Sequence, residues 1–224
     1  MHIFIITSVL KPKMGILSNE TRHQQTIKTI DSIREKAPGS LILMLDSSPE
    51  ELEPEVKKEF SSKVDYFVSL SSHQHAIECA NRGLKSPGEL YIMVIALDII
   101  RNLTLTGVQR VFKITGRGEL SDRFDISDYE FNPEMKNKFV FKKAVKSWMH
   151  PDLKLVDTRL WSFDYSMLDE VDKLVREAFT ECMATGWDLE HVYYKLIEDK
   201  TRIFEKDVIG MKCQLASTGD IIDE

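Results

Sequence analysis

The sequence has few cysteines and no long apolar segment. Its three cysteines stand far apart at positions 79, 182 and 213, so they form no CxxC pair and predict no disulfide framework. The longest strongly apolar stretch, residues 90–100, is interrupted by Asp98 and falls short of the roughly 20 residues that span a bilayer. The first residues lack the basic segment and cleavage site of a signal peptide. We therefore expect a soluble cytoplasmic protein without a transmembrane segment.

Several well-known enzyme motifs are also missing. The chain contains no GxGxxG, Walker A, GxSxG or HExxH pattern, which argues against dinucleotide oxidoreductases, P-loop enzymes, common serine hydrolases and zincin proteases. An excess of basic charge is missing as well, because 30 Lys and Arg stand against 36 Asp and Glu for a net charge of −6. Proteins held to DNA or RNA by phosphate neutralisation usually have the opposite sign, so we expect no nucleic-acid partner.

The pattern that is present alternates strands with helices. Of the 224 residues, 42% are hydrophobic and 29% charged, which is typical of a globular chain. Apolar runs predict strands at 2–9, 41–45, 64–70, 111–115 and 154–163. Amphipathic or capped segments predict helices at 20–36, 50–60, 89–102, from Ser166 to about 185, and after Asp188; residues 217–224 read as a frayed acidic tail. The rhythm predicts an α/β fold with a mainly parallel twisted sheet flanked by helices.

Ligands of such sheets bind beyond the carboxyl ends of the strands, so the residues that follow each strand are the candidates for a site. After the strand at 111–115, Gly116 permits close backbone approach and Arg117 offers a planar fork for phosphate, with Lys113 on the strand itself. Asp122 and Asp125 follow at a spacing that suits a divalent cation. An exposed turn with ordinary surface charges explains the same residues equally well.

A second group of polar residues lies at the start of the last predicted helix. Asp188 is most simply its N-cap. Glu190 and His191 lie off the apolar stripe of that helix, so we expect them to face solvent or a cleft, where a carboxylate can deprotonate a hydroxyl group. His191 can donate a hydrogen bond to a phosphate or orient Glu190, and an ordinary surface histidine is the equally good alternative. Asp46 ends a buried strand and is expected either to meet a ligand or to cap a turn.

These residues resemble small glycosyltransferases of the GT-A fold, of the Lys-Ile-Thr-Gly-Arg type found in bacterial polysaccharide loci and large DNA viruses. The resemblance rests on Thr21-Arg22 after the opening strand, Leu45-Asp46-Ser47-Ser48, the motif at 113–117, and the acidic segment 186–191. It covers about residues 1–200. A viral source would place the protein in the cytoplasm of the host cell.

The resemblance implies a nucleoside-diphosphate sugar as donor and a glycan or other hydroxyl as acceptor. One domain over residues 1–224 would bind the donor through residues 1–125 and the acceptor through residues 126–224. Glu190 would act as general base in an inverting displacement, with Asp188 as the alternative base and His191 beside them. The implied donor-binding residues are Thr7, Ser8, Arg22, Asp46, Lys113, Gly116 and Arg117.

The sequence departs from many GT-A enzymes in having no Asp-x-Asp metal motif; Asp122 and Asp125 are the nearest substitute. A Mn²⁺ or Mg²⁺ ion and a metal-independent mechanism, with Lys113 and Arg117 supplying the positive charge, are both compatible with the sequence. Two other functions stay open. One is a sugar-phosphate nucleotidyltransferase, and the other is a non-catalytic module of the same fold that binds a glycan or a protein partner.

Overall fold

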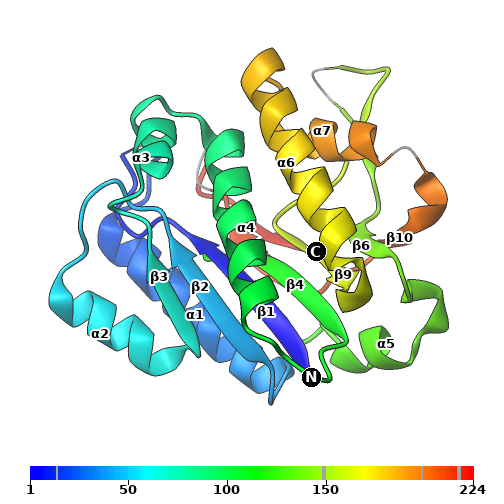
Figure 1. Ribbon diagram of the computed structural model, residues 1–224, viewed down its shortest axis with the longest axis horizontal. Coiled ribbons are helices and arrows are strands. Elements are labelled where there is room, and N and C mark those ends of the chain that lie inside the picture. Colours follow the sequence, from blue (N-terminus) through cyan, green and yellow to red (C-terminus); the bar gives the residue numbers. More distant parts are fainter. Residues whose placement is uncertain (14, 148–149, 198, 216–217) are drawn as a thin grey trace.

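The computed structural model describes residues 1–13, 15–147, 150–197, 199–215 and 218–224. A seven-stranded sheet lies between two layers of helices (Figure 1). Its strands are β1 (His2–Ser8), β2 (Leu41–Asp46), β3 (Tyr66–Ser69), β4 (Arg110–Thr115), β6 (Phe139–Lys142), β9 (Leu160–Asp164) and β10 (Ile203–Lys206). Their order is β10-β6-β9-β4-β1-β2-β3, so strands from both halves of the chain share one sheet.

Most pairings in this sheet are parallel. Strand β1 is parallel to β2 and β4, β2 is parallel to β3, and β6 is parallel to β10. Strand β9 is antiparallel to both β4 and β6. These pairings confirm the mainly parallel α/β sheet that the alternating pattern predicts.

Helices and smaller strands surround the sheet. The helices are α1 (Asn19–Lys36), α2 (Pro54–Lys63), α3 (Gln74–Asn81), α4 (Lys85–Asn102), α5 (Ile126–Phe131), α6 (Leu168–Thr185) and α7 (Leu189–Leu196). Strands β5 (Gly118–Leu120), β11 (Met211–Gln214) and β12 (Ile221–Asp223) form a small antiparallel sheet, and β7 (Val145–Lys146) pairs with β8 (Lys154–Leu155). Within the described ranges, no helix combines the length and apolarity needed to cross a membrane.

Strand β1 is buried on both faces, as its uninterrupted apolar sequence predicts. Ile3 and Ile5 belong to a core shared with α4, α6 and α7, whereas Phe4 and Ile6 belong to a core shared with α1 and α2. Figure 1 shows α4 and α6 in front of the sheet and α1 behind it. Burial on both faces is typical of an interior strand, and β1 lies between β4 and β2 in the sheet.

Several helix ends follow from the capping residues. The Ser18 side chain accepts a hydrogen bond at the start of α1, Gly186 ends α6 with a φ of 73°, and the Asp188 side chain caps α7. The helix expected from Ser166 begins at Leu168 instead, because the Asp164 side chain accepts from the Ser166 N–H in a short 3₁₀ turn that precedes α6.

Other boundaries differ from the prediction. Helix α2 begins at Pro54 rather than at residue 50, since proline fits the first turn of a helix, where its missing N–H costs nothing. The strand expected over 154–163 is two strands, β8 and β9, separated by a turn in which the Asp157 side chain accepts from the Arg159 N–H. Helix α3 lies in a segment for which we predict neither a helix nor a strand from the sequence.

The C-terminal segment is ordered against the rest of the protein, so the expectation of a frayed tail is wrong for the part that is described. Strand β12 pairs antiparallel with β11. The Glu224 carboxylate forms ion pairs with Lys142 and Arg159. Ser217, the first residue of the expected tail, lies outside the described residues. The ion pairs of Glu224 with Lys142 and Arg159 are long-range interactions that local composition does not reveal.

Candidate active site

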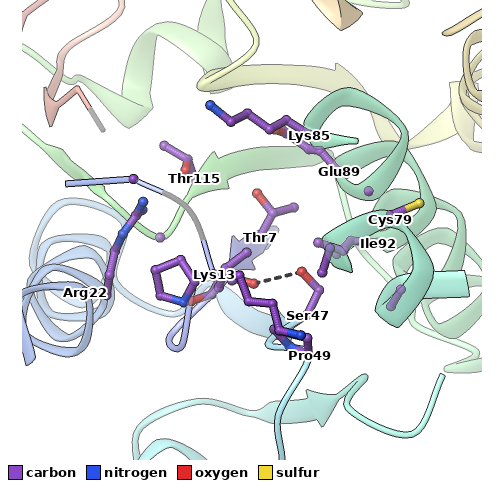
Figure 2. A pocket seen from close by; sticks show the side chains of 18 of the residues that line it. Thr7, Lys13, Arg22, Ser47, Pro49, Cys79, Lys85, Glu89, Ile92 and Thr115 are labelled. Carbon is purple, nitrogen blue, oxygen red and sulfur yellow. Dashed lines mark hydrogen bonds between the residues drawn. The ribbon is translucent and has the colours of Figure 1, made fainter. Parts of the chain in front are cut away.

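A cavity lies at the carboxyl ends of β1 and β4, beside the end of β2. The register pairs Ser8 of β1 with Asp46 of β2, and Thr7 of β1 with Thr115 of β4, so these strands end at the same edge. The loop after β1, the first turns of α1, and helices α3 and α4 complete the walls (Figure 2). The cavity therefore occupies the edge at which parallel sheets bind ligands.

Five of the residues predicted to bind a donor line this cavity: Thr7, Ser8, Arg22, Gly116 and Arg117. Gly116 is the residue that brings α1 and β4 together. A Cβ atom at Gly116 would lie 3.1 Å from Thr26 Oγ1 and 3.2 Å from the Ser8 Cβ, closer than ordinary packing allows. The Thr26 hydroxyl donates to the Gly116 carbonyl oxygen at 3.0 Å. This contact places the start of α1 against the end of β4.

Arg22 is a buried cation with no partner among the residues that the structure describes. Its residue is 9% exposed, and its Nε is buried without a hydrogen bond. Among the described residues, no carboxylate or carbonyl oxygen accepts a hydrogen bond from its guanidinium group. Burial and, to a smaller extent, the nearby Arg117 guanidinium together lower the pKa of Arg22 to about 10. A buried positive charge next to a second one is unfavourable unless an anion binds there.

Arg117 supplies the second positive charge of this end of the cavity. It follows β4 directly, and its Nη1 donates to the Gln214 carbonyl oxygen at 3.2 Å. No salt bridge involves Arg117 within the part of the chain that the structure describes. We call Arg22 and Arg117 together the cationic end of the cavity.

Lys113 lies at the opposite side of the site and is fully paired. It is 1% exposed, its Nζ forms a salt bridge with Glu89 of α4, and it donates to the Thr158 carbonyl oxygen at 2.7 Å. The Thr158 hydroxyl in turn donates to Glu190 Oε1 at 2.8 Å. We call Glu89, Lys113, Thr158 and Glu190 the carboxylate network. Glu89 is its only member that lines the cavity among the described residues.

Glu190 lies behind this network and does not line the cavity. Burial raises the pKa of the Glu190 carboxyl, and the Glu89 carboxylate nearby raises it further, while the hydrogen bond from Thr158 lowers it. Glu190 nevertheless lies near Lys113, because Thr158 contacts both through its hydroxyl and its carbonyl oxygen.

Asp188 and His191 interact with each other at the start of α7. The Asp188 side chain accepts a hydrogen bond from the His191 N–H at 3.2 Å and also contacts the His191 ring nitrogen Nδ1. His191 is only 4% exposed and packs against the rings of Trp187 and His150, so the expectation that it faces solvent or a cleft is wrong. Neither Asp188 nor His191 lines the cavity.

Asp46 is fully buried and holds the loop after β1. Its two carboxylate oxygens accept hydrogen bonds from the Leu10 N–H at 2.8 Å and the Ser48 N–H at 3.0 Å. Burial raises the pKa of this carboxyl. Of the two roles that the sequence leaves open, the contacts are those of a turn cap, and Asp46 is not part of the cavity wall.

The two candidate metal ligands lie apart from the cavity and have local partners. Asp122 forms an ion pair with Lys36 at 2.6 Å, and Asp125 caps α5 by accepting from the Ser127 N–H at 2.9 Å. No group of three or more His, Cys, Asp or Glu side chains suited to a metal ion occurs in the described part of the chain. These residues do not fit a metal site at the cationic end of the cavity.

Sequence reasoning did not identify the residues that α3 and α4 contribute to the site. Lys85 and Glu89 lie one turn apart on α4 and both line the cavity (Figure 2). The available signal was a carboxylate at the start of a helix that is otherwise mostly apolar. Lys13, in the loop after β1, also lines the cavity and donates to the Asn81 side chain of α3 at 2.7 Å.

Comparison with known proteins finds similarity in structure only. No family description matches the sequence, and no curated protein matches it. Core-mannan synthase A (CmsA/Ktr4) from Aspergillus fumigatus, solved in its Mn/GDP form, superposes with a TM-score of 0.54 at 9% identity, over 91% of this chain and 72% of that one. The glycosyltransferase GlyE of Streptococcus pneumoniae gives a TM-score of 0.51 at 7% identity, over 92% of this chain and 45% of GlyE.

A glycosyltransferase involved in glycosylation of the major capsid of PBCV-1 also matches, with a TM-score of 0.47 and 11% identity over 92% of this chain and 82% of that one. This chain spans less than half the length of GlyE. The superpositions on CmsA/Ktr4 and GlyE confirm the fold: this chain has the α/β fold of GT-A-like glycosyltransferases.

Proposed function

We propose that this protein is a glycosyltransferase that takes a sugar from a nucleoside-diphosphate sugar and transfers it to a hydroxyl group. The observation that carries the proposal is Arg22, a buried guanidinium without a partner among the described residues, beside Arg117 in the cavity wall. A diphosphate supplies the anion that this pair lacks, since guanidinium groups bind phosphate oxygens through two parallel hydrogen bonds. Thr7, Ser8 and Gly116 complete the proposed donor site.

The cationic end of the cavity has a direct role in the proposed reaction. When the bond between the sugar and the diphosphate breaks, negative charge develops on the leaving diphosphate. Fixed positive groups that face this charge lower the barrier, because they are already oriented when the charge appears. Arg22 and Arg117 are held in this way by the packing of α1 against the end of β4.

The proposal assigns the proton of the acceptor hydroxyl to Glu190. Because Glu190 does not line the donor cavity, the assignment requires the acceptor to reach this carboxylate from beside the cavity. A general base works best when its pKa lies near the working pH, and burial together with Glu89 raises the pKa of Glu190 in that direction. In an inverting displacement the acceptor oxygen attacks the sugar as the diphosphate leaves, and no covalent enzyme intermediate forms. Asp188 and His191 contribute by holding the first turn of α7, on which Glu190 lies.

Binding of nucleotides tests the donor site. We expect at least one of UDP, GDP and TDP to raise the melting temperature, because a ligand that binds only the folded state stabilises it. The series is measured with and without Mn²⁺, because CmsA/Ktr4 was solved in a Mn/GDP form. Arg22→Met should abolish the shift. Arg123→Met removes a half-exposed arginine outside the cavity and should preserve it.

Transfer assays then test the reaction. Glu190→Gln should abolish sugar transfer to glycan acceptors and leave nucleotide binding unchanged. Release of pyrophosphate from a nucleoside triphosphate and a sugar phosphate would instead identify a nucleotidyltransferase. Binding of nucleotide sugars without turnover on any acceptor would identify a binding module. Absence of any nucleotide-induced shift contradicts the proposal as a whole.

A further inference from the structure

Resting on the proposed function, we infer that Glu89 binds the sugar of the donor, through hydrogen bonds that its carboxylate accepts from sugar hydroxyl groups. Among the described residues that line the cavity, Glu89 is the only one with a carboxylate. Figure 2 shows Glu89 and Lys85 on one side of the cavity and Arg22 on the other, with Thr7 and Thr115 between them. The cavity thus offers positive groups for a diphosphate at one end and an acceptor of hydrogen bonds at the other.

The way Glu89 is held leaves part of its carboxylate available. Its Oε1 contacts Lys113 Nζ, and no partner of Oε2 is found within the described ranges. A carboxylate has about four acceptor positions, so the lysine occupies only part of this capacity. The Glu89 side chain is 32% exposed, while that of Lys113 is 1% exposed. The lysine is buried under the carboxylate, and the carboxylate faces the cavity.

Lys113 also fixes the direction of the carboxylate. Its Nζ is held by the Thr158 carbonyl oxygen at 2.7 Å, and Thr158 is itself 2% exposed. A charged acceptor that is oriented before the ligand arrives loses little conformational freedom on binding. Hydrogen bonds to a charged acceptor are stronger than those between neutral groups. A hydroxyl-rich ligand such as a hexose presents the donors that this arrangement lacks.

A purely structural role for Glu89, as counter-ion of Lys113, makes a different prediction. A counter-ion would influence binding of the nucleotide with and without its sugar to the same degree, through the shape of the site. A sugar-binding residue influences only the ligand that carries a sugar. Binding of the two ligand types to the same variant therefore distinguishes the roles.

The experiment measures the dissociation constants of UDP, GDP and TDP and of UDP-glucose, GDP-mannose and TDP-glucose by calorimetry, for the wild type and Glu89→Gln. The glutamine retains an oxygen that accepts from Lys113, so the variant is expected to fold, and circular dichroism checks this. We expect Glu89→Gln to weaken binding of the preferred sugar nucleotide by about 10-fold or more, with the matching nucleoside diphosphate within about 2-fold of wild type. Glu134→Gln, an exposed change outside the cavity, should alter neither.

Glu89→Asp gives a second measure, because it keeps the charge for Lys113 and shortens its reach by one methylene group. It should weaken sugar-nucleotide binding selectively as well. Equal losses for both ligand types, or no loss for either, would overturn the inference while leaving the donor site at Arg22 and Arg117 intact. Failure of the wild type to bind any of the six ligands would overturn the inference together with the proposed function.

Discussion

Arg22 and Lys113 are both buried cations, yet their surroundings are opposite. Lys113 has a carboxylate and a carbonyl oxygen as partners, whereas Arg22 has neither among the described residues and lies beside another arginine. A buried charge with partners belongs to the scaffold, since removing it leaves those partners unpaired. A buried charge without partners stabilises the folded state no more than a neutral side chain of similar size does. The comparison therefore separates the part of the cavity that shapes the site from the part that binds an anion.

Removal of the paired cation should have the largest effect on stability. In Lys113→Met the Thr158 carbonyl loses its donor and Glu89 loses its counter-ion. Loss of one partner of a buried pair costs about 3–5 kcal/mol, and we expect roughly 3 kcal/mol because Glu89 keeps contact with water in the cavity. In a chain of this size the melting temperature should fall by about 6–12 °C. Urea unfolding provides the free energy of unfolding, and a loss below about 1 kcal/mol would contradict the scaffold role.

Asp46 extends the comparison to a buried anion whose partners are backbone N–H groups. In Asp46→Asn one carboxylate oxygen becomes an NH₂ group, so either the Leu10 N–H or the Ser48 N–H loses its acceptor. We expect the free energy of unfolding to fall by about 1–2 kcal/mol, since an unsatisfied buried donor costs that much and removal of a buried charge offsets part of it. Nucleotide affinity should change less than about 2-fold.

A large loss of nucleotide affinity in Asp46→Asn with unchanged stability would reverse this assignment. It would place Asp46 against the base or ribose, as the resemblance to GT-A enzymes implies. Denaturant unfolding and calorimetric binding on the same preparation separate the two outcomes.

The parts of the site that the sequence predicts are those fixed by local pattern. Gly116 and Arg117 directly follow an apolar run that predicts a buried strand, and parallel strands end at one edge, so their place beside the end of β1 is predictable. Thr7 and Ser8 are implied by the resemblance to GT-A enzymes. The capping residues Ser18, Asp188 and Gly186 act within one turn of chain and are equally predictable.

The rest of the site depends on packing between distant segments. Whether Glu89 faces the cavity is decided by how α4 is rotated against the sheet, and its pairing with Lys113 spans 24 residues. Thr158 joins the network only because the expected strand at 154–163 is interrupted. Asp46 shows the same limit at one position. The sequence predicts a buried carboxylate at a strand end that needs hydrogen-bond donors. It does not reveal that the two donors are N–H groups from the loop after β1 and from the turn that Asp46 itself begins.

Thr158 provides a smaller, pH-dependent test of the carboxylate network. Its hydroxyl stabilises the ionised form of Glu190 and so lowers the pKa of that carboxyl. Thr158→Val removes the hydroxyl, so the pKa of Glu190 should rise further. A general base acts when ionised, and activity is lost as the pH falls through its pKa. The acid limb of the kcat profile should therefore move to higher pH. An unmoved limb would exclude Glu190 as the base.

The smallest expected effect is also the sharpest test of the comparison. Arg22→Met keeps an unbranched side chain of similar packing and removes the charge. Because the guanidinium has no partner among the described residues and its burial disfavours the charged form, the free energy of unfolding without ligand should stay within about 0.5 kcal/mol of wild type or rise. The sign is thus opposite to that for Lys113→Met. A nucleoside diphosphate should stabilise the wild type and not the variant. With the ligand present, the wild type should therefore have the larger free energy of unfolding. A loss of more than about 1 kcal/mol without ligand would mean that Arg22 supports the fold, and the distinction between the two cations would fail.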